Sequence, residues 1–304
     1  MKSNLLTLFC VVALFSIASS QQLNPTAHFM YNQLIYNPAS AGMHETQLNT
    51  SLLTRLQWTA IEGAPVYTSI WGDYRTKKNK MALGVNLTNL VYSGYRNNEA
   101  NVNYSYHLKT GKRTKLLMGL RAGLSSLRFD PSGLTIWDDG DGTVDASAFR
   151  KTMPKLGAGF QFQYLNKFYA GIASPDFFST NKVEYTGDTA ESFLKRKRNY
   201  IFMSGASLPL GDLYNLKPNV GVFYHPDNGM TANVNATFEI KDYFWAGLSF
   251  SSIRALTIMA GTQISSRIRF GYAFELFAGV SSARLYTHEL NLMLTLDNLF
   301  RKKK

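Results

Sequence analysis

The sequence has a single cysteine, little charge and no long hydrophobic run in its main part, and each shortage excludes a class of protein. The one cysteine, Cys10, lies in an N-terminal apolar stretch, so the remaining chain has no disulfide, thiolate metal site or cysteine nucleophile. Beyond that stretch, no segment reaches about 18 apolar residues without a polar break, which excludes a membrane protein built from helices. Charged residues make up only 17% of the 304 residues, whereas about 25% is usual in soluble domains.

Apolar and aromatic side chains are abundant instead. Hydrophobic residues make up 45% and aromatic residues 13% of the chain, which is enough apolar material to exclude a disordered protein. The mean hydropathy is nevertheless only −0.15. This combination is typical of a transmembrane β-barrel, because every second strand residue faces lipid while its neighbours face a polar interior.

The first twenty residues have the features of a secretory signal peptide. Lys2 supplies a positive start, an apolar stretch runs from Leu5 to Ile17, and small residues follow. The stretch is too short to span a membrane as a helix. Cys10 lies in its middle, whereas a lipoprotein needs a cysteine just after it. We therefore expect a signal peptide over 1–20, cleaved near Ser20 and Gln21, and export of the mature chain.

Apolar and polar residues alternate through most of the mature chain, and segments with a helical period are missing. Between Met230 and Ile240, for example, every second residue is apolar and the others are polar. Alternation of this length predicts strands with one apolar and one polar face. The candidate strands are fourteen, an even number, at 46–58, 65–75, 80–91, 97–109, 114–127, 154–165, 167–174, 198–209, 216–225, 230–240, 242–252, 255–264, 267–277 and 284–296.

Strands of this length and number predict a closed barrel. Most are long enough to cross a membrane when tilted, whereas the strands of a soluble β-sandwich are usually about five or six residues long. The two long connections, 128–153 and 175–197, both fall on the outer side if the chain starts in the periplasm. We therefore predict an all-β protein, a transmembrane antiparallel up-and-down β-barrel of outer-membrane type, occupying residues 45–304.

Basic residues exceed acidic ones, with a formal net charge of +12. They gather at the inner turns, at the C-terminal tail and in one outer run, Lys195, Arg196, Lys197 and Arg198. One interpretation is a solvated rim that avoids the membrane core. The other is contact with anionic lipopolysaccharide outside and with an acidic periplasmic partner inside. A nucleic-acid partner is not expected, because no recognition element accompanies the charge.

Two patterns invite a chemical interpretation. Asp139, Asp141 and Asp145 resemble the first part of an oxygen-rich Ca²⁺ loop, but the bidentate Glu is lacking and an Asp-Gly-rich turn has the same composition. His288 and Asn291 could accompany a serine in an outer-membrane lipase, although such coincidences arise easily. We expect no enzyme activity and no cofactor.

Residues 21–44 precede the first strand and do not alternate. The prolines of Asn24-Pro25 and Asn37-Pro38 interrupt the segment, and apolar side chains such as Phe29 and Met30 lie between them. These side chains must be buried, so we expect this non-barrel segment to lie at the periplasmic mouth or in the lumen.

The same segment carries a family resemblance that continues along the chain. It contains Asn37, Pro38, Ala39 and Gly42, and is followed by Gln57 and Trp58 and by Gly63, Ala64 and Pro65. With weaker matches at 169–175, 245–250, 270–274 and 288–290, the chain resembles the PorP/SprF family of type IX secretion system membrane proteins. It departs from the family pattern at Thr26-Ala27-His28, at Ser40 and at Tyr286-Thr287.

The resemblance implies an outer-membrane barrel without enzyme activity that works with other type IX secretion components. Such proteins help to secrete large surface proteins, including adhesins of gliding motility, and to hold them at the cell surface. The resemblance also implies that each barrel recognises its partner through the partner's C-terminal domain. The alternative from the residues themselves is a general porin or small-molecule transporter, because a barrel of this size has room for a lumen.

Overall fold

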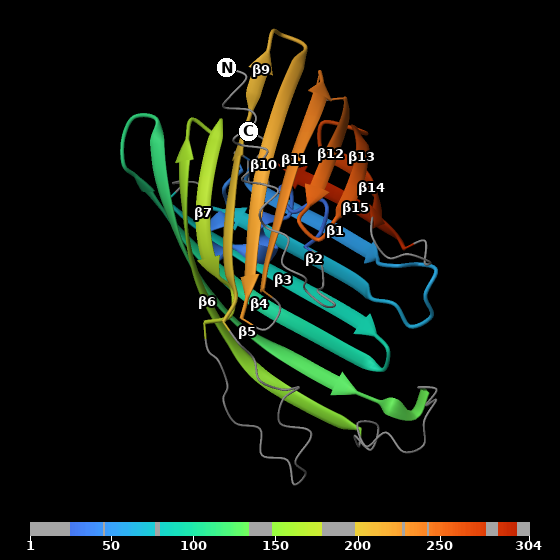
Figure 1. Ribbon diagram of the computed structural model, residues 1–304. Coiled ribbons are helices and arrows are strands. Elements are labelled where there is room, and N and C mark those ends of the chain that lie inside the picture. Colours follow the sequence, from blue (N-terminus) through green and yellow to red (C-terminus); the bar gives the residue numbers. More distant parts are fainter. Residues whose placement is uncertain are drawn as a thin grey trace, which may run out of the picture.

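The computed structural model describes residues 25–44, 46–76, 80–133, 148–177, 198–226, 229–241, 243–277 and 285–296. Its strands form one antiparallel sheet in chain order, and the sheet closes into a barrel because β1 pairs with β15 (Figure 1). The strands are β1 Leu48–Leu56, β2 Val66–Arg75, β3 Met81–Tyr92, β4 Tyr95–Lys109, β5 Thr114–Phe129, β6 Phe149–Tyr164, β7 Phe168–Ser174, β8 Tyr200–Ala206, β9 Leu208–Leu210, β10 Tyr214–His225, β11 Gly229–Ile240, β12 Phe244–Ser251, β13 Ala255–Gln263, β14 Ile268–Phe277 and β15 Tyr286–Leu296.

The barrel wall has fourteen strands, as the alternation predicts. The segments β8 and β9 both pair with β10 and are two parts of one strand, interrupted at Ser207. Apart from β1 and β15, which pair with each other, each remaining strand pairs with its neighbours in the chain. Over the described ranges, closure leaves no open sheet edge of the kind that lipid would not tolerate. The prediction of a closed, outer-membrane type barrel is confirmed.

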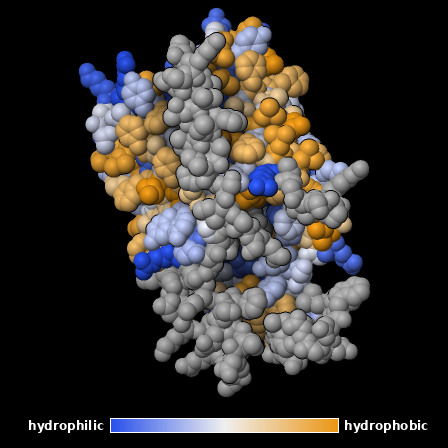
Figure 2. All heavy atoms as spheres, in the orientation of Figure 1, coloured by the Kyte–Doolittle hydropathy of each residue, from blue (hydrophilic) through white to orange (hydrophobic). Residues whose placement is uncertain are grey.

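The alternating pattern places the apolar residues outside. Along β11, Thr231, Asn235 and Glu239 are buried and point inward, whereas Val234 is 52% exposed on the outer face. Outward leucines on other strands are equally exposed, which in water would be unfavourable and in lipid is not. Figure 2 shows hydrophobic side chains spread over the visible wall.

The ends of the wall are named here by their connections. The loop end carries the connections that follow β1, β3, β5, β7, β10, β12 and β14, and the turn end carries the others. At the loop end β5 continues to Phe129 and β6 begins at Phe149. The expected loop 128–153 is therefore shorter than predicted, because residues at both of its ends belong to paired strands. Backbone hydrogen bonds continue there although the side-chain alternation becomes polar.

The interior is occupied by residues 25–44, which we call the luminal segment. It contains one helical turn, α2 Gln33–Tyr36, and a 3-10 turn, η1 Pro38–Ser40. Its apolar side chains, with Phe29 and Leu34 almost fully buried, pack in two clusters against inward-facing residues such as Trp71 and Trp245. Among the described residues, no helix is long and apolar enough to cross a membrane.

Candidate functional site

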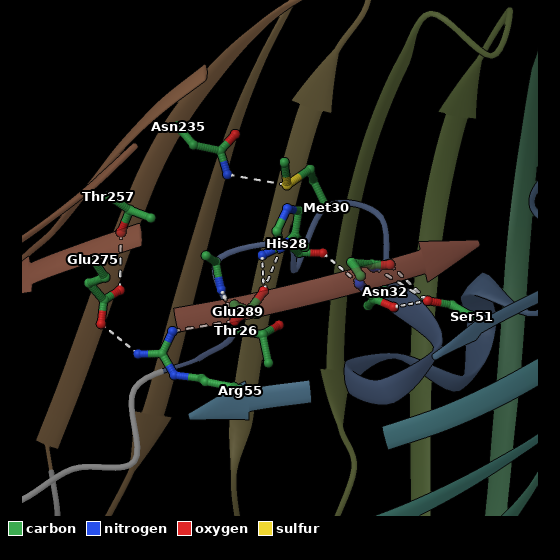
Figure 3. A network of polar contacts seen from close by, with 12 residues as sticks. Thr26, His28, Met30, Asn32, Ser51, Arg55, Asn235, Thr257, Glu275 and Glu289 are labelled. Carbon is green, nitrogen blue, oxygen red and sulfur yellow. Dashed lines mark hydrogen bonds and ion pairs between the residues drawn. The ribbon is translucent and has the colours of Figure 1, made fainter. Parts of the chain in front are cut away.

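The densest group of buried polar contacts lies where the luminal segment meets β15. The carboxylate of Glu289 accepts hydrogen bonds from the backbone N–H groups of Ala27 and His28, both at 2.8 Å. His28 Nδ1 lies 2.7 Å from the same carboxylate. Figure 3 shows Glu289 pointing from the wall toward this end of the segment. One wall carboxylate therefore holds two consecutive residues of the segment.

Arg55 on β1 joins this carboxylate to a second one. Its guanidinium lies 3.3 Å from Glu289 Oε2 and 2.5 Å from Glu275 Oε1 on β14. Thr257 on β13 donates a hydrogen bond of 3.1 Å to Glu275. All three charged side chains are at most 3% exposed, so their charges are compensated by one another rather than by bulk water. We call Arg55, Glu275, Glu289 and His28 the luminal charge network.

Asn32 anchors the middle of the luminal segment. Its amide oxygen accepts hydrogen bonds from Trp71 Nε1 at 2.8 Å and Ser51 Oγ at 2.9 Å, while its amide nitrogen donates to the backbone oxygen of His28. Tyr36 closes a second contact within the segment, because its hydroxyl accepts the backbone N–H of Thr26 at 3.0 Å. Burial raises the pKa of Tyr36 from 10.0 to about 12, so this hydroxyl stays neutral.

The residues that resemble the family opening lie against the opposite wall. The side chain of Asn37 accepts the backbone N–H of Ala39 and donates to the backbone oxygen of Phe160, at 2.9 and 3.2 Å. Pro38 begins the 3-10 turn, where its missing N–H leaves no hydrogen bond unmade. Gly42 has a φ of +67°, and its N–H donates to Asp73 at 2.9 Å. This part of the motif therefore shapes the end of the luminal segment.

Glycine in the wall permits this close approach. A Cβ atom on Gly119 would lie 2.1 Å from the backbone nitrogen of Ala39, and one on Gly159 would lie 2.1 Å from Asn37 Oδ1. Arg121 donates to the backbone oxygens of Leu34 and Ile35. Because these two positions have no side chain, the luminal segment packs directly against the backbone of β5 and β6.

The remaining motif residues form the loop between β1 and β2. The backbone N–H of Gln57 donates a hydrogen bond of 2.9 Å to the carbonyl of Pro65, and Ala64 lies between Gly63 and Pro65 in the turn. Gly63 has a φ of +72°, and its carbonyl accepts the N–H of Ser93 in the next hairpin at 2.9 Å. Trp58 packs edge-on against Phe277, with 5.9 Å between ring centroids. These residues therefore link neighbouring connections at the loop end of the wall rather than lying in the lumen.

The structure describes only some of the other sequence candidates. Asp139, Asp141 and Asp145, as well as Lys195, Arg196 and Lys197, lie outside the described residues. Arg198, the last residue of the basic run, lies over the Phe177 ring, 5.4 Å from its centroid.

His288 and Asn291 are on opposite faces of β15. His288 contacts the hydroxyl of Tyr272 on the outer face, and Asn291 is buried next to Ser51. They cannot act together on one substrate in this arrangement.

Sequence reasoning did not assign a role to the luminal charge network. Glu289 falls within the matched stretch 288–290, whereas Arg55 and Glu275 are polar residues of the predicted strands 46–58 and 267–277. The available signal was the position of each charge on the inward face of its strand. A charge at such a position requires a partner in the lumen or water.

Comparison with known proteins agrees with the fold. A family model described as "Type IX secretion system membrane protein PorP/SprF" matches residues 18–294. No curated protein sequence matches the chain.

Three solved structures that resemble the chain are a channel, a transporter and an outer membrane protein, each distant in sequence. The CymD monoaromatic hydrocarbon channel has a TM-score of 0.53 and 13% identity, over 92% of this chain and 95% of that one. The Ralstonia pickettii toluene transporter TbuX has a TM-score of 0.52 and 10% identity, over 92% and 96%. The Acinetobacter baumannii outer membrane protein Omp33 has a TM-score of 0.50 and 10% identity, over 83% and 98%. At these identities the likeness shows the fold alone.

Proposed function

The chain belongs to the PorP/SprF family of type IX secretion system membrane proteins, and we propose that it helps to secrete and anchor a large surface protein. The family and the barrel fold place it in the outer membrane and are those of a non-enzymatic protein. The finer proposal is that the barrel recognises one exported partner, such as an adhesin, and holds it at the cell surface.

The occupied lumen is the observation that carries this proposal. Residues 25–44 contact the inner faces of β1, β2, β4 to β6 and β15, through hydrogen bonds and the luminal charge network. A general porin needs a water-filled lumen for its solutes. A barrel whose lumen contains its own segment is better suited to binding a partner on its outside surfaces.

The loop end is the surface that we assign to the exported partner. The wall is extended there by β4, β5 and β6, and the connections 130–148 and 175–199 join the strands at this end. Long connections face outward in outer-membrane barrels, where a surface protein is to be held. The basic turn end, with exposed Lys109 and Arg113, is the surface for acidic periplasmic components of the secretion machinery.

Deleting residues 178–194 tests the docking role. The deletion keeps Asp176, which pairs with Lys155 at 3.0 Å, and the basic run that ends at Arg198, so the barrel wall should fold as before. We expect the partner surface protein to appear in the medium instead of on the cell surface, measured by mass spectrometry of both fractions. Replacing Lys195, Arg196 and Lys197 by Gln at full loop length is the matched control for charge. Unchanged surface retention after the deletion would contradict the proposal.

A further inference from the structure

Three arginines stand side by side on the outer face of the wall at the loop end. Arg96 on β4 is directly opposite Arg128 on β5, and Arg128 is directly opposite Arg150 on β6. All three are exposed. We call them the arginine row. Side chains at directly opposite positions are about 5 Å apart at Cβ, and like charges in such pairs destabilise a sheet.

Within the part of the chain that the structure describes, the row has one ion pair, which compensates its charge weakly. Arg128 contacts Asp130 at 3.0 Å, but the two side chains are 60% and 39% exposed. An ion pair as open as this contributes little, because water and salt screen it. The row therefore has an excess of positive charge fixed on neighbouring strands, which favours the binding of an anion.

Below the arginine row, toward the membrane centre, the same strands carry two further rows on the same face. The first is uncharged and polar, with Asn98, Ser126 and Thr152 in register. The next is apolar, with Ala100, Leu124 and Pro154 in register. From the loop end toward the membrane centre, the outer face of these strands thus changes from charged to polar to apolar, one step for every two residues. This order matches a lipid with a phosphate, a sugar and an acyl chain.

A groove of about 530 Å³ lies over these rows on the outer face. Its apolar part is lined by Leu52, Ile70, Leu87 and Leu124, and its polar part by Asn98 and Arg150 among others. The four apolar side chains are 45–56% exposed, so they are accessible to an acyl chain. The groove extends from the apolar belt of the barrel to Arg150, at one end of the arginine row.

We propose that this surface binds a phosphorylated glycolipid of the outer leaflet. The arginine row takes the phosphate, because guanidinium groups present paired N–H donors that match phosphate oxygens. The polar row hydrogen-bonds the sugar, and the groove holds an acyl chain. The leaflet follows from the position of the row at the loop end, which faces outward in outer-membrane barrels. This site is separate from the luminal segment.

Native mass spectrometry of the detergent-purified barrel tests the site, with diphosphorylated lipid A and dephosphorylated lipid A as probes. We expect one phosphorylated lipid per barrel, bound about tenfold more tightly than the dephosphorylated form. The triple variant Arg96→Gln, Arg128→Gln, Arg150→Gln should remove that preference. The matched control, Lys109→Gln, Arg113→Gln, Arg267→Gln, removes three exposed charges from the turn end and should keep it.

The proposal is overturned if wild-type barrel binds both lipid forms equally, or if the triple Gln variant keeps the preference. Displacement of the lipid by inorganic phosphate at equal concentration would assign the row to free anions, and displacement by an acidic peptide would assign it to a protein; either result overturns the proposal. If the Gln variant does not fold, the triple Arg→Lys variant, which keeps the charge but loses the paired donors, should still weaken the preference. The wild-type comparison of the two lipids needs no variant.

Discussion

At the scale of the residue, the luminal charge network decides how the N-terminal segment is held. Arg55 lies between two carboxylates that are far from it in sequence, and each of them contacts its guanidinium. One of them, Glu289, also accepts hydrogen bonds from the backbone N–H groups of residues 27 and 28. Removing one member is therefore more costly than removing the set, because it leaves a buried charge without a partner.

Replacing Arg55 by Met should destabilise the barrel by about 3–5 kcal/mol, because Glu275 and Glu289 would lose the cation between them. The free energy of unfolding in urea measures this loss. The triple variant Arg55→Met, Glu275→Gln, Glu289→Gln removes both unpaired charges and should recover a large part of it. Arg254→Met, at an exposed turn, is the control for loss of an arginine alone. A triple variant no more stable than Arg55→Met would argue against compensation within the network.

At the scale of the element, the fit between the luminal segment and the wall depends on the absence of side chains at the contact. The 3-10 turn over Pro38–Ser40 lies against β5 and β6 where glycine stands on both strands. The atoms that a Cβ on Gly119 would meet belong to the backbone of residues 38 and 39, which cannot rotate aside as a flexible side chain would. The segment and these strands therefore constrain each other.

Gly119→Ala should displace the end of the luminal segment, because the new Cβ would lie 2.1 Å from a backbone nitrogen. We expect faster proteolysis within residues 37–44, measured as the rate of cleavage in the folded barrel. Gly72→Ala on β2 is the matched control, since its nearest neighbour would be 3.6 Å away, an ordinary van der Waals distance. Equal cleavage rates in the two variants would show that the wall tolerates a methyl group at Gly119.

At the scale of the whole molecule, a closed wall and an occupied lumen distinguish the two functions considered. The wall resembles those of a channel and a transporter, but at 10–13% identity this shows only the fold. The lumen contains residues 25–44, held at both ends by buried contacts. Retention of a surface protein needs the outside of such a barrel, whereas passage of solutes needs its inside.

Conductance in planar bilayers separates the two functions. We expect no steady pore from the wild-type barrel, because the luminal segment occupies the lumen, and a steady pore from a variant that lacks residues 25–44. The Arg55→Met variant should show intermediate, flickering conductance as the segment leaves and returns. A steady open pore from the wild type, with no surface protein bound, would favour the porin.

The sequence by itself determined the fold class and the number of strands. Alternation is a local property of the chain, and a strand that is apolar on one face must turn that face to lipid or to a core, as Val234 and Thr231 on β11 illustrate. Strand ends were less predictable, because pairing carries β5 and β6 past the end of the apolar alternation to Phe129 and Phe149.

Only the tertiary structure decided which side chains meet. Arg55 is 220 residues from Glu275 and 234 from Glu289, and only the closure of β1 on β15 brings them together. The arginine row likewise depends on the registers of β4, β5 and β6, which no local pattern specifies. The physical reason is the same in both cases. Periodicity sets the face on which a residue lies, whereas register and closure set its neighbours.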